Sequence, residues 1–309
     1  VTATDADGTT TYTYSISDGA DATKFAIDAS TGALAFVSAP NFDVAGDAGA
    51  DNVYDVVVQV SDGTNVDTQA IAVTVTGVND NTPAITSNGG DATAGVSVVE
   101  NTTAVTTVTA SDADQGTGSS LTYSISGGAD STKFAINGST GALTFVSAPN
   151  YEAQTDADAN NVYDVTVQVS DGTNTDTQAI AVTVTGVNDN TPVITSNAGG
   201  ATASVTINEN TTAVTTVTAT DADLGTGGSL SYSISGGADA TKFAIDASTG
   251  ALTFVSAPNF EAPTDAGGNN VYDVTVQVSD GTNTDTQAIA VTVADVGALA
   301  FTSGTSVSV

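Results

Sequence analysis

The fold of this chain is decided by Tyr163-Asp-Val-Thr-Val-Gln-Val169, the turn Ser170-Asp-Gly-Thr-Asn174, and Ile180-Ala-Val-Thr-Val184. Apolar and polar residues alternate in the first and last parts, as in strands that bury one face and expose the other. Asp and Asn form side-chain turns and Gly supplies a positive φ, so the middle part predicts a tight connection. The stretch therefore predicts two adjacent strands of a sheet.

The same stretch recurs along the chain. Residues 162–184 are identical to residues 271–293, and Lys24, Lys133 and Lys242 follow one another at equal intervals. The period is longer than the ~20–50 residues of a solenoid unit. It suits a complete small domain repeated in tandem.

Each period contains about seven short alternating segments separated by Gly-rich turns, a pattern typical of antiparallel two-sheet sandwiches. No segment keeps a 3.6-residue period. We therefore predict an all-β fold of tandem Greek-key antiparallel β-sandwiches of immunoglobulin-like type, with nearly no helix. The predicted domains are 1–78, 79–187 and 188–296, followed by a spare strand at 297–309.

The two ends of the sequence differ from the repeat. Val1-Thr-Ala-Thr-Asp5 matches Val108-Thr-Ala-Ser-Asp112, so the first domain is expected to lack its first strand. The segment 297–309 resembles the opening strand of a further repeat. Two explanations stay open: the sequence is cut from a longer array, or the spare strand completes the first domain of the next subunit by strand addition.

Composition excludes several functions. The net charge is −32, from 35 acids and three bases, and such a surface repels nucleic acids and anionic membranes. The chain contains no His, Cys, Met or Trp, and its three bases are all lysines. The usual general base and thiol nucleophile are thus missing, and each acid pair has a counterpart in other repeats. We predict no enzyme activity.

Two linkers carry the strongest chemical signal. Asn79-Asp-Asn-Thr-Pro83 and Asn188-Asp-Asn-Thr-Pro192 each stand where one alternating segment ends and the next begins. Proline lacks the N–H that a sheet needs and stops the strand. The preceding side chains crowd oxygen atoms together, and oxygen is the ligand that Ca²⁺ prefers. The linkers therefore predict calcium-stiffened joints.

Further acidic motifs recur around the linkers in a constant order. They are a Glu followed by Asn, an Asp-x-Asp pair, an Asn-x-acid motif and Val-Ser-Asp-Gly. Their acids are Glu100 and Glu209; Asp5 and Asp7, Asp112 and Asp114, Asp221 and Asp223; Asp43, Glu152 and Glu261; Asp62, Asp171 and Asp280. With these motifs, essentially the whole chain resembles bacterial cadherin-like repeats, which occur in large extracellular adhesins.

The resemblance implies calcium at two joints, through two sets of residues. The first linker group is Asp43, Asn79, Asp80, Asn81, Asp112, Asp114 and Asp171. The second linker group is Glu100, Glu152, Asn188, Asp189, Asn190, Asp221, Asp223 and Asp280. Glu209 and Glu261 are not followed by Asn-Asp-Asn, so that end of the third domain is expected to be poor in calcium.

The resemblance also implies a role. It predicts a calcium-stabilised, extracellular or cell-surface structural and adhesive protein of the kind found in bacterial biofilms. Its partners would be other copies of itself, joined head to tail in a filament, or neighbouring repeats of a longer chain. A partner on a cell surface is also expected. The alternative is a glycan- or surface-binding module of a giant adhesin, which requires exposed aromatic residues clustered in one repeat.

Overall fold

The computed structural model describes residues 1–6, 8, 11–114, 120–224 and 229–297. These residues fall into two compact units. The first contains Val1–Val98, Thr102–Ala148 and Asp156–Thr183, and the second contains Val99–Asn101, Pro149–Thr155 and the chain from Val184 onward. Apart from Gly297, the expected spare strand lies outside the described residues. The domain boundaries given above remain predictions.

The described part of the chain is built from strands. It contains 23 strands and five 3-10 helices of three residues each, and no α-helix. The all-β expectation is therefore confirmed. No helix within the described residues has the length and apolar character needed to cross a bilayer.

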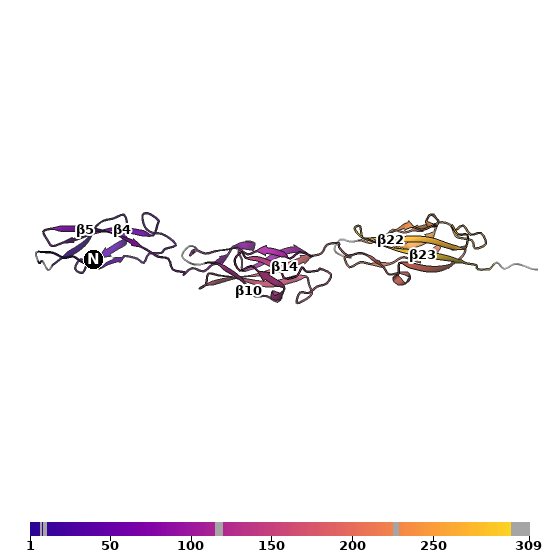
Figure 1. Ribbon diagram of the computed structural model, residues 1–309, viewed down its shortest axis with the longest axis horizontal. Helices are drawn as coiled ribbons and strands as arrows, with labels where there is room; N and C mark the ends of the chain where they lie inside the picture. Colours follow the sequence, from indigo (N-terminus) through magenta and orange to yellow (C-terminus); the bar gives the residue numbers. More distant parts are fainter. Residues whose placement is uncertain (7, 9–10, 115–119, 225–228, 298–309) are drawn as a thin grey trace, which may run out of the picture. The chain divides into compact units, whose positions relative to one another are not determined.

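The first sandwich contains β1 (Thr13–Asp18), β2 (Phe25–Ile27), β3 (Leu34–Phe36), β4 (Val53–Ser61) and β5 (Val66–Thr74). One sheet has the order β1-β4-β5, and β2 pairs with β3 in the other. Strands β4 and β5 pair antiparallel along their whole length and lie side by side in Figure 1.

The second sandwich has a four-stranded sheet of β10 (Thr122–Gly127), β13 (Val162–Ser170), β14 (Thr175–Thr185) and β7 (Thr93–Val99), in that order. Opposite it are β11 (Phe134–Ile136), β12 (Ala142–Phe145) and β8 (Ala104–Thr107). A short pair joins β6 (Ala84–Ile85) to β9 (Ala110–Ser111).

The third sandwich repeats this arrangement. Its four-stranded sheet is β16 (Thr202–Asn208), β23 (Thr284–Ala294), β22 (Val271–Ser279) and β19 (Ser231–Gly236), with β22 and β23 labelled in Figure 1. The second sheet contains β17 (Ala213–Thr216), β21 (Ala251–Phe254) and β20 (Phe243–Ile245), and β15 (Val193–Ile194) pairs with β18 (Ala219–Thr220).

The third sandwich contains a parallel pairing, in which β16 runs alongside β23 from Thr202 opposite Ala288 to Asn208 opposite Ala294. No hairpin connects these strands, because β16 is the first strand of this sheet in the sequence and β23 is its last. The turn between β13 and β14 is formed as expected. Asp171 Oδ1 accepts the backbone N–H groups of Thr173 at 2.7 Å and Asn174 at 2.6 Å.

The core of each sandwich contains aromatic residues at equivalent positions. In the third sandwich, Phe254 meets Tyr272 edge to face, with ring centroids 5.0 Å apart. Tyr272 is 1% exposed and packs among Val274, Val276 and Ile289. The alternating residues expected to face inward are those that the structure buries.

Gly237 marks a close backbone approach in the third sandwich. Gly237 has φ +107°, and a Cβ there would lie 2.4 Å from the carbonyl oxygen of Asp273. Gly281 has φ +99°, and a Cβ built on it would have no neighbouring atom within 4 Å. Gly237 is thus constrained by both conformation and space, whereas Gly281 is constrained by conformation alone.

We expect Gly237→Ala to destabilise the third sandwich more than Gly281→Ala. The positive φ costs about 1–3 kcal/mol in either variant, and the clash with Asp273 adds to it only in the first. Differential scanning calorimetry of the full chain measures both shifts. Equal shifts would show that the contact with Asp273 is not a constraint.

Candidate metal centres

The first linker group lies wholly within the first compact unit, around the side chain of Asn81. Carboxylate oxygens of Asp43, Asp80 and Asp114 lie within 4.8 Å of one another. Asn81 Nδ2 donates to Asp43 Oδ2 at 2.9 Å, to Asp114 Oδ1 at 2.9 Å and to Asp80 Oδ1 at 3.2 Å. One neutral amide with two N–H groups cannot balance three carboxylates.

Asp114 anchors the linker to the second sandwich. The residue is fully buried, and its Oδ2 accepts the backbone N–H groups of Asp80 at 3.0 Å and Asn81 at 2.7 Å. The side-chain amide of Asn81 is the main cause that holds the pKa of Asp114 below its ordinary value, and these backbone groups add to it. Asp114 is therefore ionised in a buried position.

The Asp-x-Asp motif is shaped by its own local turn. Asp112 Oδ1 accepts the backbone N–H of Asp114 at 2.9 Å, which orients the first carboxylate. The other oxygen of Asp112, Oδ2, is buried with no hydrogen-bond partner. Asp221 repeats this arrangement with Asp223, and Asp221 Oδ2 is likewise buried with no partner.

Linker side chains also reach the turn after the Val-Ser-Asp-Gly motif. Asn79 Nδ2 donates to the carbonyl oxygen of Asp171 at 3.3 Å, and Asn188 Nδ2 donates to that of Asp280 at 3.4 Å. In Asp171, burial opposes ionisation, but the N–H groups of Asn174 and Thr173 outweigh it and lower the pKa. Asp171 and Asp280 therefore belong to the linker environment and also stabilise their own turns.

The second linker group lies within the second compact unit and is richer in carboxylates. Oxygens of Glu100, Glu152 and Asp189 lie within 4.8 Å of one another. Glu100 is 1% exposed and accepts the backbone N–H groups of Tyr151 and Val187, each at 2.7 Å. This buried glutamate thereby fixes the start of the linker.

Asn190 holds Asp223 as Asn81 holds Asp114. Its backbone N–H donates to Asp223 Oδ2 at 2.7 Å, and its Nδ2 donates to Asp223 Oδ1 at 2.8 Å and Asp189 Oδ1 at 3.1 Å. Burial opposes ionisation of Asp223, but these hydrogen bonds outweigh it and lower its pKa.

The ionised form of Glu152 is destabilised in this arrangement. Both of its carboxylate oxygens are buried with no hydrogen-bond partner. Burial raises its pKa, and repulsion by Glu100 and Asp223 raises it further. A divalent cation at this position would supply the missing positive charge, so the donor set fits Ca²⁺.

The structure also adds Asp295, which the sequence reasoning missed, to the motif residues Glu209 and Glu261. Glu209, Glu261 and Asp295 form a third group of converging carboxylates, at the end expected to be poor in calcium. Asp295 occupies the repeat position of Gly186, so comparing the repeats at that position would have found it. Asn174 and Asn283 were missed too, and their Nδ2 groups donate to the linker carbonyls of Asn81 at 2.7 Å and Asn190 at 2.8 Å.

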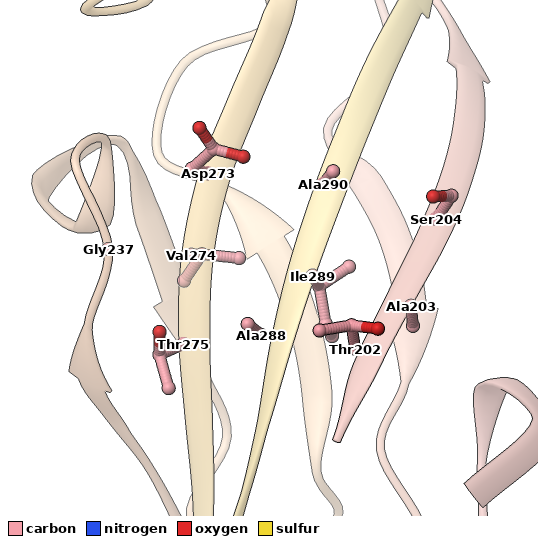
Figure 2. Close-up of a pocket in the computed structure, with 10 residues that line it drawn as sticks. All are labelled: Thr202, Ala203, Ser204, Gly237, Asp273, Val274, Thr275, Ala288, Ile289 and Ala290. Atoms are coloured by element: carbon pink, nitrogen blue, oxygen red, sulfur yellow. The ribbon is translucent and has the colours of Figure 1, made fainter. Parts of the chain in front are cut away.

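A shallow cavity of about 420 Å³ lies on the four-stranded sheet of the third sandwich. Figure 2 shows Ser204, Asp273, Thr275 and Ala290 among its lining residues. Ala, Thr and Ser predominate in the lining, and no aromatic residue takes part. The cavity therefore offers no ring on which a sugar could stack.

Comparison with known proteins identifies the family. The cadherin domain profile matches residues 95–185 and 203–294, which is more than half of the chain. The chain belongs to the cadherin domain family. The two matches correspond to the second and third sandwiches, and the linker groups occupy the ends of these cadherin domains.

Individual relatives cover parts of the chain. It is 34% identical to protein dachsous of Drosophila melanogaster over 119 residues, and 32% identical to human protocadherin Fat 4 over 147 residues. These alignments cover 38% and 46% of this chain but only 3% of each relative. A crystal structure of mouse cadherin-23 repeats EC22–24 is similar in fold, with a TM-score of 0.61, 24% identity and coverage of 92% and 86% of the two chains.

We expect Glu152→Gln to have opposite effects with and without calcium. In chelator it removes a buried charge that Glu100 and Asp223 repel, so the unfolding temperature of the second linker region rises. In calcium it removes a ligand, so the temperature falls. Thermal unfolding in millimolar calcium and in EDTA measures both changes.

Asp273→Asn provides the control, because it removes one exposed charge from β22 outside the linker groups. It is expected to leave both unfolding temperatures unchanged. A Glu152→Gln variant that behaves like this control in both buffers would argue against a metal ion at Glu152.

Proposed function

We propose that this chain is a segment of an extracellular structural and adhesive protein whose cadherin domains are locked by Ca²⁺ at their linkers. The observation that carries the proposal is the set of buried carboxylate oxygens without a hydrogen-bond partner at Asp112, Glu152 and Asp221. Hydrogen bonds from Asn81 and Asn190 leave most of the negative charge around them unbalanced. Calcium is the cation whose oxygen preference and flexible coordination suit such sites.

The first and second linker groups would hold the ions. Ca²⁺ takes about six to eight oxygen ligands, which each group can supply from side chains, backbone carbonyls and water. Binding at a site that forms only in the folded linker stabilises that linker by mass action, with about 2.7 kcal/mol when calcium is at 100 times its Kd. A string of domains would thereby stiffen.

Extracellular localisation follows from the same chemistry. Extracellular calcium modules work at about 10⁻⁴–10⁻³ M, where moderate affinity is enough. Asn79, Asn81, Asn188 and Asn190 take linker positions with neutral amides, so moderate affinity is expected. The bacterial source suggested by the motifs remains a prediction, and the curated relatives above are animal proteins.

We also propose that copies of this chain associate head to tail into filaments. Near-identical repeats suit a fibre, because the same geometry is copied without a specialised domain. The alternative, a glycan-binding module, receives no support from the aromatic-free cavity of the third sandwich.

Calcium should raise the unfolding temperature of the full chain, and EDTA should abolish the increase. Asp114→Asn and Asp223→Asn should each weaken calcium binding at their own linker by about 10–100-fold or more, since even indirect ligand partners cost that much. Calorimetry at several calcium concentrations measures this. Asp158→Asn is the matched control, because Asp158 is exposed and outside both linker groups.

The expected result is a calcium-dependent shift that the control retains and the two variants reduce. If calcium leaves the unfolding temperature of the native chain unchanged, calcium has no part in the function. If Asp158→Asn reduces the shift as much as Asp114→Asn, the ions sit elsewhere.

A further inference from the structure

The three lysines are the only bases of the chain, and they recur at one position of the repeat. In the first sandwich Lys24 ends the 3-10 helix Ala22–Lys24, and its backbone N–H donates to the carbonyl oxygen of Asp21 at 2.8 Å. Lys242 ends the equivalent helix of the third sandwich, with the same bond to Asp239 at 2.8 Å. The same turn therefore places one ammonium group at the same point of both sandwiches.

A cavity adjoins the lysine in both sandwiches. It lies between Lys24 and Tyr54 in the first and between Lys242 and Tyr272 in the third, with volumes of about 310 and 320 Å³, and is here called the lysine pocket. Each residue that lines the first pocket has its repeat counterpart in the lining of the third. The hollow is therefore a property that the sandwich fold repeats, and it differs from the shallow cavity of Figure 2.

Two hydrogen-bond donors border the same open point of the first lysine pocket. A Cβ built on Gly46 would lie 3.3 Å from Tyr54 Oη and 3.9 Å from Lys24 Nζ. Tyr54 Oη accepts the backbone N–H of Gly46 at 3.2 Å, which leaves its own proton to donate. A ligand oxygen beside Gly46 would thus meet an ammonium and a hydroxyl donor together.

The third lysine pocket keeps this polar end and adds a hydroxyl group. Thr264 stands at the repeat position of Gly46, and its backbone N–H donates to Tyr272 Oη at 3.1 Å. The hydroxyl of Thr264 lies 3.4 Å from the same oxygen. Lys242 is half-buried beside them. The donors of the pocket therefore remain when the glycine is replaced.

The charges around the lysine pocket are the reverse of those elsewhere on the chain. No carboxylate lines either pocket, although the chain has 35 acids. Within the described residues, neither Lys24 nor Lys242 forms an ion pair. The cavity of Figure 2, by contrast, has Asp273 in its lining. An anion is the partner that these ammonium groups can accept, since a charge-assisted hydrogen bond is stronger than a neutral one.

The remainder of the pocket is apolar. In the third sandwich Phe254 is 4% exposed and packs edge to face against Tyr272 in the lining. Val255 also lines the pocket and is 65% exposed, and its backbone N–H donates to the carbonyl oxygen of Lys242 at 2.8 Å. Val37 repeats this in the first sandwich with 64% exposure. A ligand with an apolar body would cover these side chains and remove their surface from water.

The balance of charge favours one carboxylate over a phosphate group. One ammonium group offsets one negative charge, and any further charge on the ligand would be repelled by a chain of net charge −32. Lysine also offers a point charge and lacks the planar fork with which arginine holds phosphate at two points. The pocket therefore suits a singly charged anion.

We propose that the lysine pockets of the first and third sandwiches bind a small carboxylic acid with an apolar body, in its ionised form. The carboxylate accepts hydrogen bonds from the lysine ammonium and the tyrosine hydroxyl. The apolar body lies against the phenylalanine and the exposed valine. These pockets contain no member of the first or second linker group, so the site goes beyond the calcium proposal and stands without it.

NMR of the lysine side chains tests the site directly. The full chain is labelled with ¹³C,¹⁵N-lysine, so it contains three Nζ signals, and Lys24→Met and Lys242→Met assign two of them. Benzoate is the probe, and benzamide is the uncharged control of the same shape. Sodium chloride at equal ionic strength controls for screening, and calcium is held constant throughout.

We expect benzoate to shift the signals of Lys24 and Lys242 to saturation, and benzamide and chloride to leave them in place. Signals that stay in place with benzoate would overturn the proposal, as would a shift that never saturates. An equal response to benzamide would show that the ammonium group has no part in binding.

Two exposed valines of the first sandwich provide matched variants. Val37→Asp places a negative charge in the lining of the pocket and should weaken benzoate binding at Lys24 by about 10-fold or more, because it competes for the ammonium group. Val66→Asp adds the same charge at a residue that is 63% exposed and outside the pocket, and should leave binding unchanged. The signal of Lys242 serves as an internal reference in both variants.

Tyr54→Phe removes one hydroxyl group and should also weaken binding at Lys24, with Lys242 unaffected. Far-ultraviolet circular dichroism checks that each variant is folded. If Val66→Asp weakens binding at Lys24 as much as Val37→Asp does, benzoate responds to the overall charge of the sandwich and the pocket is refuted.

Discussion

The structure depends on carboxylates that are forced together where one sandwich meets its linker. At ~4 Å, two unit charges repel by about 1 kcal/mol in water and about 4 kcal/mol at the effective dielectric of a protein surface. Three carboxylates converge on Asn81, and the oxygens of Glu152 are buried beside Glu100 without a hydrogen-bond partner. Repulsion between these carboxylates therefore opposes the folded conformation of the linkers unless a cation offsets it.

The three repeats each bring carboxylates together in this way, with small variations. Glu100 and Glu152 enlarge the second linker group, and the first relies on Asp43, Asp80 and Asp114. At the third position Asp295 joins Glu209 and Glu261, although the Asn-Asp-Asn linker is replaced there. Sandwiches with nearly identical cores thus carry acidic groups of different composition, and the linkers are where the repeats diverge in chemistry.

The sandwich cores place these groups at the linkers. Each core is held by the same inward row of Val, Ile and aromatic residues, which in the first sandwich includes Phe25, Tyr54 and Val56. Ile71 and Val73 of this sandwich are half-buried.

The sequence by itself determined the fold class, the repeat and the linker motifs. Alternation in Tyr163–Val169 and the Asp171-Gly172 turn fix local conformation through side-chain direction and backbone freedom, which are properties of neighbouring residues. The linker oxygens at Asp80 and Asp189 were visible for the same reason, as they stand side by side in the sequence.

Only the tertiary structure decided which distant groups meet. Asp43 and Asp114 share Asn81 because two loops fold against one linker, and the raised pKa of Glu152 comes from burial and from Glu100 and Asp223. The parallel placement of β16 beside β23 depends on sheet order. Such contacts are set by packing between segments far apart in the chain, so they cannot be predicted from a pattern of neighbouring residues.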